Sequence, residues 1–267
     1  MLYVKRTFDF EFPVEESDVA LLGIPWDFSE TGKPTRFAPV FIREAIKNLF
    51  GYDPKTKKNI FKIYKFCDLG DVEVVPGNWS LTYSRIKDTI KQIFQSNPNI
   101  FPVFLGGDHL ITLGILRSLK LFYEKITVID FDAHRDLYPN FLGGKFSHLT
   151  WAYHVAKDKS FELVQIGTRA WSGEEERILK KCRIKSTLRG IKNPIYLTFD
   201  LDVLDISDVG TPEPSGMKFE ELVKIIGRIP KDRIIGMDIV EGAPDNFYSR
   251  SSVAAANIIK YVLLHRA

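Results

Sequence analysis

A repeated alternation of short apolar runs and helix-like segments is the feature that most constrains how this chain folds. The runs are rich in Ile, Val and Phe, and they are apolar at nearly every position rather than at every second one. Such runs are typical of parallel strands that are buried on both faces of a sheet. The expected strands are Val19–Ile24, Ile60–Leu69, Phe101–Leu105, Ile126–Phe131, Leu163–Ile166, Ile195–Phe199 and Ile234–Val240.

Amphipathic patterns lie between several of these runs and near the C-terminus. In residues 86–94 and again in residues 255–263, apolar side chains recur at the spacing of one helix face. Leu110–Leu121 is apolar nearly all round, which indicates a buried helix. The alternation predicts one domain, residues 1–267, folded as a three-layer α/β/α sandwich with a doubly wound parallel sheet and helices on both faces.

The charge and composition of the chain narrow its partners and its compartment. Lys and Arg number 37 against 34 Asp and Glu, without a dense basic stripe, which argues against nucleic-acid binding. No uncharged apolar run reaches about 18 residues, so we expect no membrane span. Charges interrupt the first twelve residues too often for a signal peptide. Cys67 and Cys182 lie far apart, which favours reduced thiols in a cytoplasmic protein.

Four of the expected strands end in acidic or histidine side chains, at the sheet edge where doubly wound folds bind ligands. His109 follows the third strand after two glycines, which permit a tight turn. Asp132, His134 and Asp136 follow the fourth strand, and all three share one side if the chain stays extended. Asp130 has the same parity but lies deeper, so we interpret it as an outer partner of the site or as hydrogen-bonded core.

The other two of these four strands end in carboxylates. Asp200 and Asp202 follow the sixth strand with the same spacing of two residues. A carboxylate at a buried strand end is costly unless it is paired or bound to a metal. Glu241 ends the last strand, where the residues alone leave open a capping role, a salt bridge or a functional role.

The residue types at these strand ends favour a pair of divalent cations. Four carboxylates and two imidazoles can build two sites if one or two aspartates bridge them. Oxygen-rich ligation without thiolate favours Mn²⁺ over a structural zinc. Two such cations can share a water molecule, lower its pKa and hold it as hydroxide. The candidate metal ligands are His109, Asp132, His134, Asp136, Asp200 and Asp202.

Several segments together resemble the ureohydrolase family, which includes arginases and agmatinases. They are LGGDHLITLGILRSL, FDAHRDLY, SHLTW, TFDLDVLD, GTPEPSG and GMDIVEGAP, and the resemblance covers nearly the whole chain. It implies an arginase-like fold with a mainly parallel, eight-stranded sheet. It also implies two Mn²⁺ per chain, with Ni²⁺, Co²⁺ or Fe²⁺ as alternatives, and hydrolysis of a guanidino C–N bond to urea and an amine. The family usually forms trimers or hexamers, which implies a homo-oligomer.

The resemblance implies a role for each residue of these motifs. One cation would have the ligands His109, Asp132, Asp136 and Asp200, and the other Asp132, His134, Asp200 and Asp202, with Asp132 and Asp200 bridging. Asp136 would also pass a proton to the leaving nitrogen. His148 matches the mobile-loop histidine that shuttles a proton, a task suited to a pKa near neutrality. Glu241 matches the glutamate that pairs with the substrate guanidinium.

The resemblance implies a small guanidino compound as the substrate, and the loop after Asp136 bears on which compound it is. Residues 137–147 lack the stretch with which arginases hold an amino-acid tail, and the segment GGKFSH resembles archaeal agmatinase-type members. Agmatine, giving putrescine and urea, is therefore the leading substrate. Arg135 and Lys145 add positive charge near the mouth, which would favour formiminoglutamate or a guanidino acid unless Arg135 faces away, as strand parity predicts. Arginase activity and a non-catalytic metal-binding paralogue are the remaining alternatives.

Overall fold

The computed structural model describes residues 12–27 and 33–267. We expect no signal peptide in the first twelve residues, and all of these except Phe12 lie outside the described residues. One sheet has the strand order β4-β1-β5-β10-β9-β6-β7-β8, and all its pairings are parallel. Its strands are β1 (Val19–Ile24), β4 (Phe66–Asp71), β5 (Phe101–Gly106), β6 (Ile126–Phe131), β7 (Phe161–Ile166), β8 (Ile184–Lys185), β9 (Ile195–Asp200) and β10 (Ile234–Val240).

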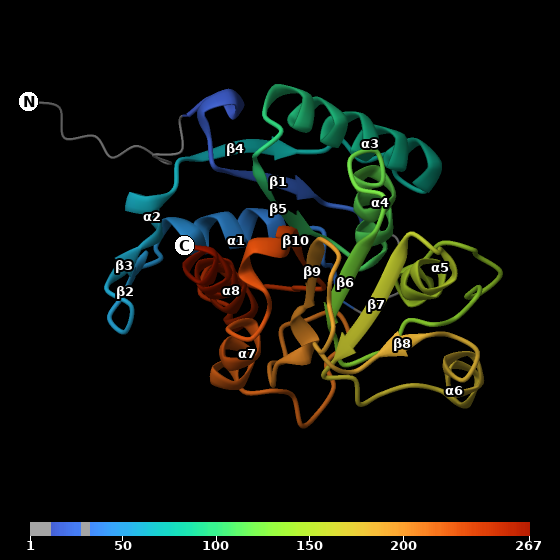
Figure 1. Ribbon diagram of the computed structural model, residues 1–267. Coiled ribbons are helices and arrows are strands. Elements are labelled where there is room, and N and C mark those ends of the chain that lie inside the picture. The colour runs from blue at the N-terminus through green and yellow to red at the C-terminus, as the bar shows by residue number, and fades with distance from the viewer. Residues whose placement is uncertain (1–11, 28–32) are drawn as a thin grey trace, which may run out of the picture.

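Helices cover both faces of this sheet (Figure 1). Alternate residues of β1 belong to two separate hydrophobic clusters, one on each face, as expected for a strand buried on both sides. One cluster includes side chains of α1 (Ala38–Lys47), α7 (Phe219–Ile226) and α8 (Arg250–Arg266). The other includes side chains of α3 (Trp79–Ser96), α4 (Leu110–Leu119) and α5 (Trp151–Lys157). The predicted α/β/α sandwich with a parallel sheet is therefore confirmed.

The remaining elements are short. A small hairpin consists of β2 (Tyr52–Asp53) and β3 (Lys58–Asn59), and α6 (Gly173–Leu179) follows β7. Four 3₁₀ turns are η1 (Val14–Glu16), η2 (His148–Thr150), η3 (Leu201–Val203) and η4 (Lys231–Arg233). Among the described residues, no helix is long and apolar enough to cross a membrane.

The strand predicted over residues 60–69 is wrong in its first half. Residues 60–63 form the helix α2 (Ile60–Ile63), and β4 begins only at Phe66. The side chain of Asn59 accepts a hydrogen bond from the Phe61 N–H, 3.0 Å away, and so caps this turn. A short apolar run does not distinguish a buried helical turn from a strand, which explains the error.

The strand order gathers the ends of four strands that lie far apart in the sequence. The chain passes from β5 directly to β6, and it later inserts β9 and β10 between them. Because β5, β10, β9 and β6 are parallel neighbours, their carboxyl ends lie along one edge of the sheet. The segments that carry the candidate site residues start from this edge.

The two glycines at the end of β5 permit a close approach of backbones rather than a special turn conformation. Neither Gly106 nor Gly107 has a positive φ. A Cβ on Gly107 would lie 1.9 Å from the carbonyl oxygen of Trp26, and one on Gly106 would lie 2.6 Å from Cδ1 of Ile111. The missing side chains let the segment that leads to His109 lie directly against the end of β1.

We expect Gly107→Ala to lower the free energy of unfolding by about 1–3 kcal/mol, because the added methyl group collides with backbone that cannot move aside easily. Urea denaturation followed by circular dichroism would measure this loss. Gly173→Ala is the matched control, since a Cβ there meets no atom within 4 Å. Equal stability of the two variants would contradict the proposed close approach.

Candidate metal centre

His109 stands at the start of α4 and is completely buried. Its Nδ1 atom lies 3.2 Å from Oδ2 of Asp132, 3.3 Å from Oδ2 of Asp200 and 3.5 Å from Oδ2 of Asp136. This nitrogen has no hydrogen-bond partner. The Nδ1 edge of the imidazole is therefore turned to three carboxylates from two other strands, as a ligand to a shared cation would be.

His134 forms the second part of the cluster. Its Nδ1 atom lies 2.8 Å from Oδ2 of Asp202 and 3.7 Å from Oδ1 of Asp132. Its Nε2 atom lies 3.5 Å from Oε1 of Glu213. His134 and Glu213 are 18% and 32% exposed, whereas the other five candidate ligands are at most 5% exposed. The cluster is therefore most open to solvent on the side of His134 and Glu213.

The structure brings all six predicted ligands together, with Asp132 at the centre. One oxygen of Asp132 faces His109 and the other faces His134, so its carboxylate is placed between the two halves of the cluster. Asp200 has one oxygen toward His109, and its other oxygen accepts a hydrogen bond from the Asp202 N–H. This geometry is compatible with bridging by both aspartates.

Asp136 joins the cluster by a different route from the predicted one. The chain does not stay extended after Asp132, because Asp136 has φ of 52°. A left-handed backbone at a residue other than glycine is uncommon and stores strain. Alternation along an extended chain is therefore the wrong reason for the meeting of Asp132, His134 and Asp136, although the meeting itself occurs.

The buried charges of the cluster shift its pKa values strongly. Burial, and then the charge of Asp132, raises the pKa of Asp136 well above its usual value. Burial and the charges of Asp202 and Asp132 do the same to the pKa of Asp200. Burial also opposes the charge of Asp132, but the two adjacent histidines lower its pKa. Burial disfavours a charged His134, yet Asp132 and Asp202 raise its pKa to about 12.

These shifts describe a donor set in which bound protons offset the charge of four clustered carboxylates. Nδ1 of His109 and Oδ2 of Asp132 are buried 3.2 Å apart without any hydrogen-bond partner. Oxygen and nitrogen atoms of this kind are the ligands that divalent cations such as Mn²⁺ take in proteins. The residues present therefore fit a metal site, since a cation would satisfy the unpaired atoms and relieve the repulsion between the carboxylates.

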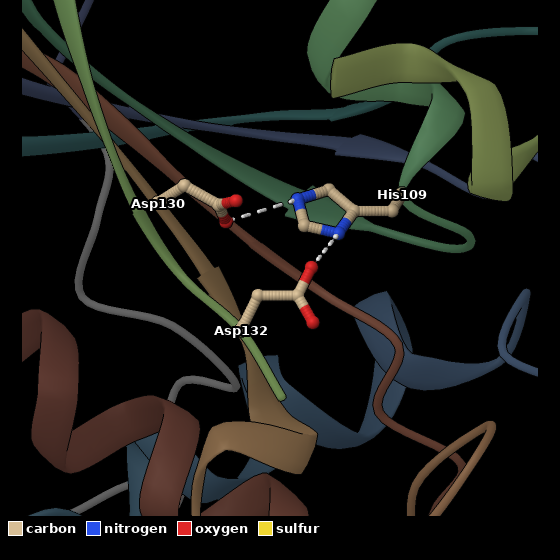
Figure 2. Close-up of side chains that lie close together, drawn as sticks. All are labelled: His109, Asp130 and Asp132. Carbon is tan, nitrogen blue, oxygen red and sulfur yellow. Dashed lines mark ion pairs between the residues drawn. The ribbon is translucent and has the colours of Figure 1, made fainter. Parts of the chain in front are cut away.

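Asp130 faces the opposite nitrogen of His109. Figure 2 shows the imidazole of His109 between Asp130 and Asp132, with one ring nitrogen toward each. The Asp130 Oδ1 atom lies 3.9 Å from Nε2 of His109, and its Oδ2 accepts a hydrogen bond from Gln165. Asp130 is thus buried and hydrogen-bonded beneath the cluster, as its position in the sequence predicts.

A row of polar side chains across the sheet supports His109, and the sequence analysis missed most of it. Thr198 is in register with Asp130 on one side and with Asp238 on the other. Its hydroxyl lies 3.0 Å from Nε2 of His109 and donates to Asp238, 2.6 Å away. Such contacts fix the orientation of a ligand imidazole, here with Nδ1 toward the carboxylates. Asp238, a lone carboxylate inside an apolar strand, was the feature of the sequence that could have indicated this polar row.

Glu241 lies directly after β10 at the edge of the cluster. Its Oε1 accepts a hydrogen bond from the His109 N–H at 2.9 Å, whereas its Oε2 is buried without a partner. A Cβ on Gly210 would lie 2.2 Å from Oε2, so a side chain there would displace this oxygen. Burial and the nearby Asp108 raise the pKa of Glu241 well above its usual value. The Oε2 atom of this carboxylate therefore has no positively charged partner among the described residues.

His148 starts η2, which Ser147 and Thr150 cap through reciprocal hydrogen bonds. The Nδ1 atom of His148 is buried and has no hydrogen-bond partner. Burial and the positive charges of His109 and His134 lower its pKa to about 4. In the metal-free protein the pKa of His148 therefore lies below the near-neutral value that suits a proton shuttle. At pH 7 it is neutral and can accept a proton.

Comparisons with known proteins agree with this geometry. The model of the Arginase family matches residues 17–265. The agmatinase of Pyrococcus horikoshii is 30% identical over 98% of both chains, and the N(1)-aminopropylagmatine ureohydrolase of Thermococcus kodakarensis is 31% identical over 97% of this chain and 96% of its own. The crystal structure of formimidoylglutamase from Bacillus subtilis superposes with a TM-score of 0.83 at 25% identity, covering 92% of this chain and 86% of that chain.

The family match spans nearly all of the described chain, and four of the six motifs that carried the resemblance lie at the carboxyl ends of β5, β6, β9 and β10. The predicted family is therefore confirmed. The chain belongs to the Arginase family and is an agmatinase-like hydrolase that acts on amidino C–N bonds.

Proposed function

We propose that this chain cleaves agmatine to putrescine and urea at a centre of two Mn²⁺ ions. The unpartnered, buried Oε2 atom of Glu241 is the observation that carries the proposal. A guanidinium is always protonated near neutral pH, and its planar N–H groups match a carboxylate. A guanidinium held by Glu241 would supply the positive charge that this buried carboxylate lacks. Its central carbon would then lie beside the six candidate ligands.

The proposed metal ligands are the six residues of the cluster. They offer oxygen and imidazole nitrogen without thiolate, which supports Mn²⁺ as the metal. Asp132 would bridge the two cations, since its two oxygens face different histidines. When bound, the two cations would make water a nucleophile at neutral pH.

Asp136 and His148 would handle the protons. The leaving amine has to depart protonated, because an amide anion is far too basic to be expelled. Asp136, buried within the cluster beside His109, would take a proton from the attacking water and pass it to this nitrogen. The neutral His148 can then exchange protons with solvent. Its replacement should cost about 10²–10⁴-fold in rate, as is typical of general acid–base assistance.

The charges near the open side of the cluster support a cationic tail on the substrate. The guanidinium of Arg135 lies over the ring of Trp171, 4.5 Å from its centroid, and donates to Gln165 at 3.2 Å. It is therefore turned away from the ligand cluster. Glu213, beside His134, places a partly exposed carboxylate on the open side instead. A negative charge there suits the ammonium of agmatine better than the carboxylate of a guanidino acid.

Metal binding should strengthen as the pH rises. The raised pKa values of Asp136, Asp200 and His134 mean that metal-free protein holds protons that a cation must displace. We expect the rise in Tm on adding Mn²⁺ to chelator-treated protein to be larger at about pH 8 than at about pH 6. In metal-free protein, the raised pKa values of Asp136 and Asp200 make their contribution to stability greatest at low pH. A metal-induced shift in Tm that is the same at both pH values would contradict this.

Urea release by Mn²⁺-loaded protein tests the proposed substrate. We expect turnover of agmatine, with arginine, guanidinobutyrate and free guanidine as comparisons, and with formamide assayed on formiminoglutamate. Glu241→Gln keeps the shape of the side chain but removes its charge. We therefore expect it to lower kcat/KM for agmatine, and the decrease should correspond to a loss of about 2–5 kcal/mol of transition-state stabilisation.

Asp132→Ala is the control for this assay and should abolish turnover of every compound. Preferred turnover of guanidinobutyrate or formiminoglutamate would contradict agmatine as the substrate and retain the amidino-hydrolase chemistry. Two bound metals per chain without turnover of any compound would contradict the proposal as a whole and favour a non-catalytic paralogue.

A further inference from the structure

We infer that Trp151 is a positioning residue of the candidate metal centre, where it holds Asp136 and His109 in place for one cation. The inference rests on the proposed function only in that these two residues bind metal. Trp151 is the first residue of α5 and is completely buried. Trp151 ends the segment SHLTW, whose resemblance to the family assigns a role to His148 and none to the tryptophan.

Two contacts of different kinds join Trp151 to the cluster. Its indole Nε1–H donates to Oδ2 of Asp136, 2.8 Å away. Its ring stacks on the imidazole of His109, with centroids 4.3 Å apart and an interplanar angle of 28°. Asp136 and His109 follow different strands, β6 and β5, and Nδ1 of His109 lies 3.5 Å from the same oxygen of Asp136. A single side chain therefore contacts both partners of this close pair.

The strained backbone of Asp136 explains why such a contact is needed. A left-handed conformation costs about 1–3 kcal/mol at a residue other than glycine, and it persists only where surrounding contacts enforce it. The first turn of α5 supplies two of them, since the Tyr153 N–H donates to the Asp136 carbonyl at 3.2 Å and Trp151 holds the carboxylate. The next residue, Leu137, donates its N–H to Glu175. Backbone and side chain of Asp136 are thus fixed together.

The chemistry of indole suits this position. Its N–H satisfies one lone pair of the carboxylate without adding a charge, so Asp136 stays free to bind a cation. A positively charged donor at the same place would repel the metal, and an apolar ring would leave the buried oxygen unsatisfied. Because Trp151 directly follows η2, the same contacts also dock the segment that carries His148 against the cluster.

Calorimetric titration of chelator-treated protein with Mn²⁺ tests this inference without any substrate. Trp151→Phe keeps an aromatic ring over His109 and removes the N–H donor. We expect the affinity of one of the two sites to fall about 10–100-fold, as is typical when an outer partner of a metal ligand is lost. Trp151→Tyr, which retains an O–H donor, should recover part of this loss.

Trp79→Phe is the matched control. Trp79 contacts Trp26 and Tyr83, and no ring contact or hydrogen bond joins it to any of the six candidate ligands within the described chain. The same exchange of indole for phenyl should leave both Mn²⁺ affinities unchanged there.

Tryptophan fluorescence gives a second readout. Saturation with Mn²⁺ should change the emission of wild-type protein and of Trp79→Phe, and should leave that of Trp151→Phe nearly unchanged. If circular dichroism shows that Trp151→Phe does not fold, wild-type protein and Trp79→Phe still test the inference. Tryptophan emission that does not change in these two proteins on Mn²⁺ binding would overturn it. In folded Trp151→Phe, Mn²⁺ affinities within about twofold of wild type would overturn it as well. Wild-type protein that binds two Mn²⁺ but hydrolyses nothing would count against the proposed function alone.

Discussion

The concentration of buried negative charge at one edge of the sheet is the constraint on which the rest of the structure depends. Asp132, Asp136, Asp200 and Asp202 meet around two imidazoles with almost no access to water. Burial by itself favours neutral acids, so such a cluster is stable only with bound protons or bound cations. The buried atoms without protein partners favour cations.

The topology of the sheet and a buried polar layer supply that support. Inserting β9 and β10 between β5 and β6 places the ends of four strands side by side, which no local property of the chain would do. One step deeper, Asp130, Thr198 and Asp238 lie in register on three neighbouring strands and orient His109 from below. From the side, Trp151 and the first turn of α5 hold Asp136. The candidate ligands are thus restrained from the sheet and from one covering layer.

The predictions succeeded where a local pattern and its structural consequence coincide. The strands at residues 19–24, 126–131 and 234–240 have the predicted bounds, because runs buried on both faces need apolar residues throughout. They failed where a contact between distant segments decides the conformation, as in the left-handed Asp136 or the contacts of Trp151. The orientation of Arg135 agrees with strand parity even though the chain there is not a regular strand. The homo-oligomer and the cytoplasmic location stay predictions.

The sequence by itself determined the family, the α/β/α architecture and the set of candidate metal ligands, because these depend on residue types and their order along each strand. Only the tertiary structure decided how the side chains meet. It placed the two oxygens of Asp132 toward different histidines, left one oxygen of Glu241 unpaired, and turned Arg135 away while bringing Glu213 to the open side. The reason is physical, because residues as far as 132 positions apart become neighbours at this site. No local preference encodes the distances between such residues or their protonation states.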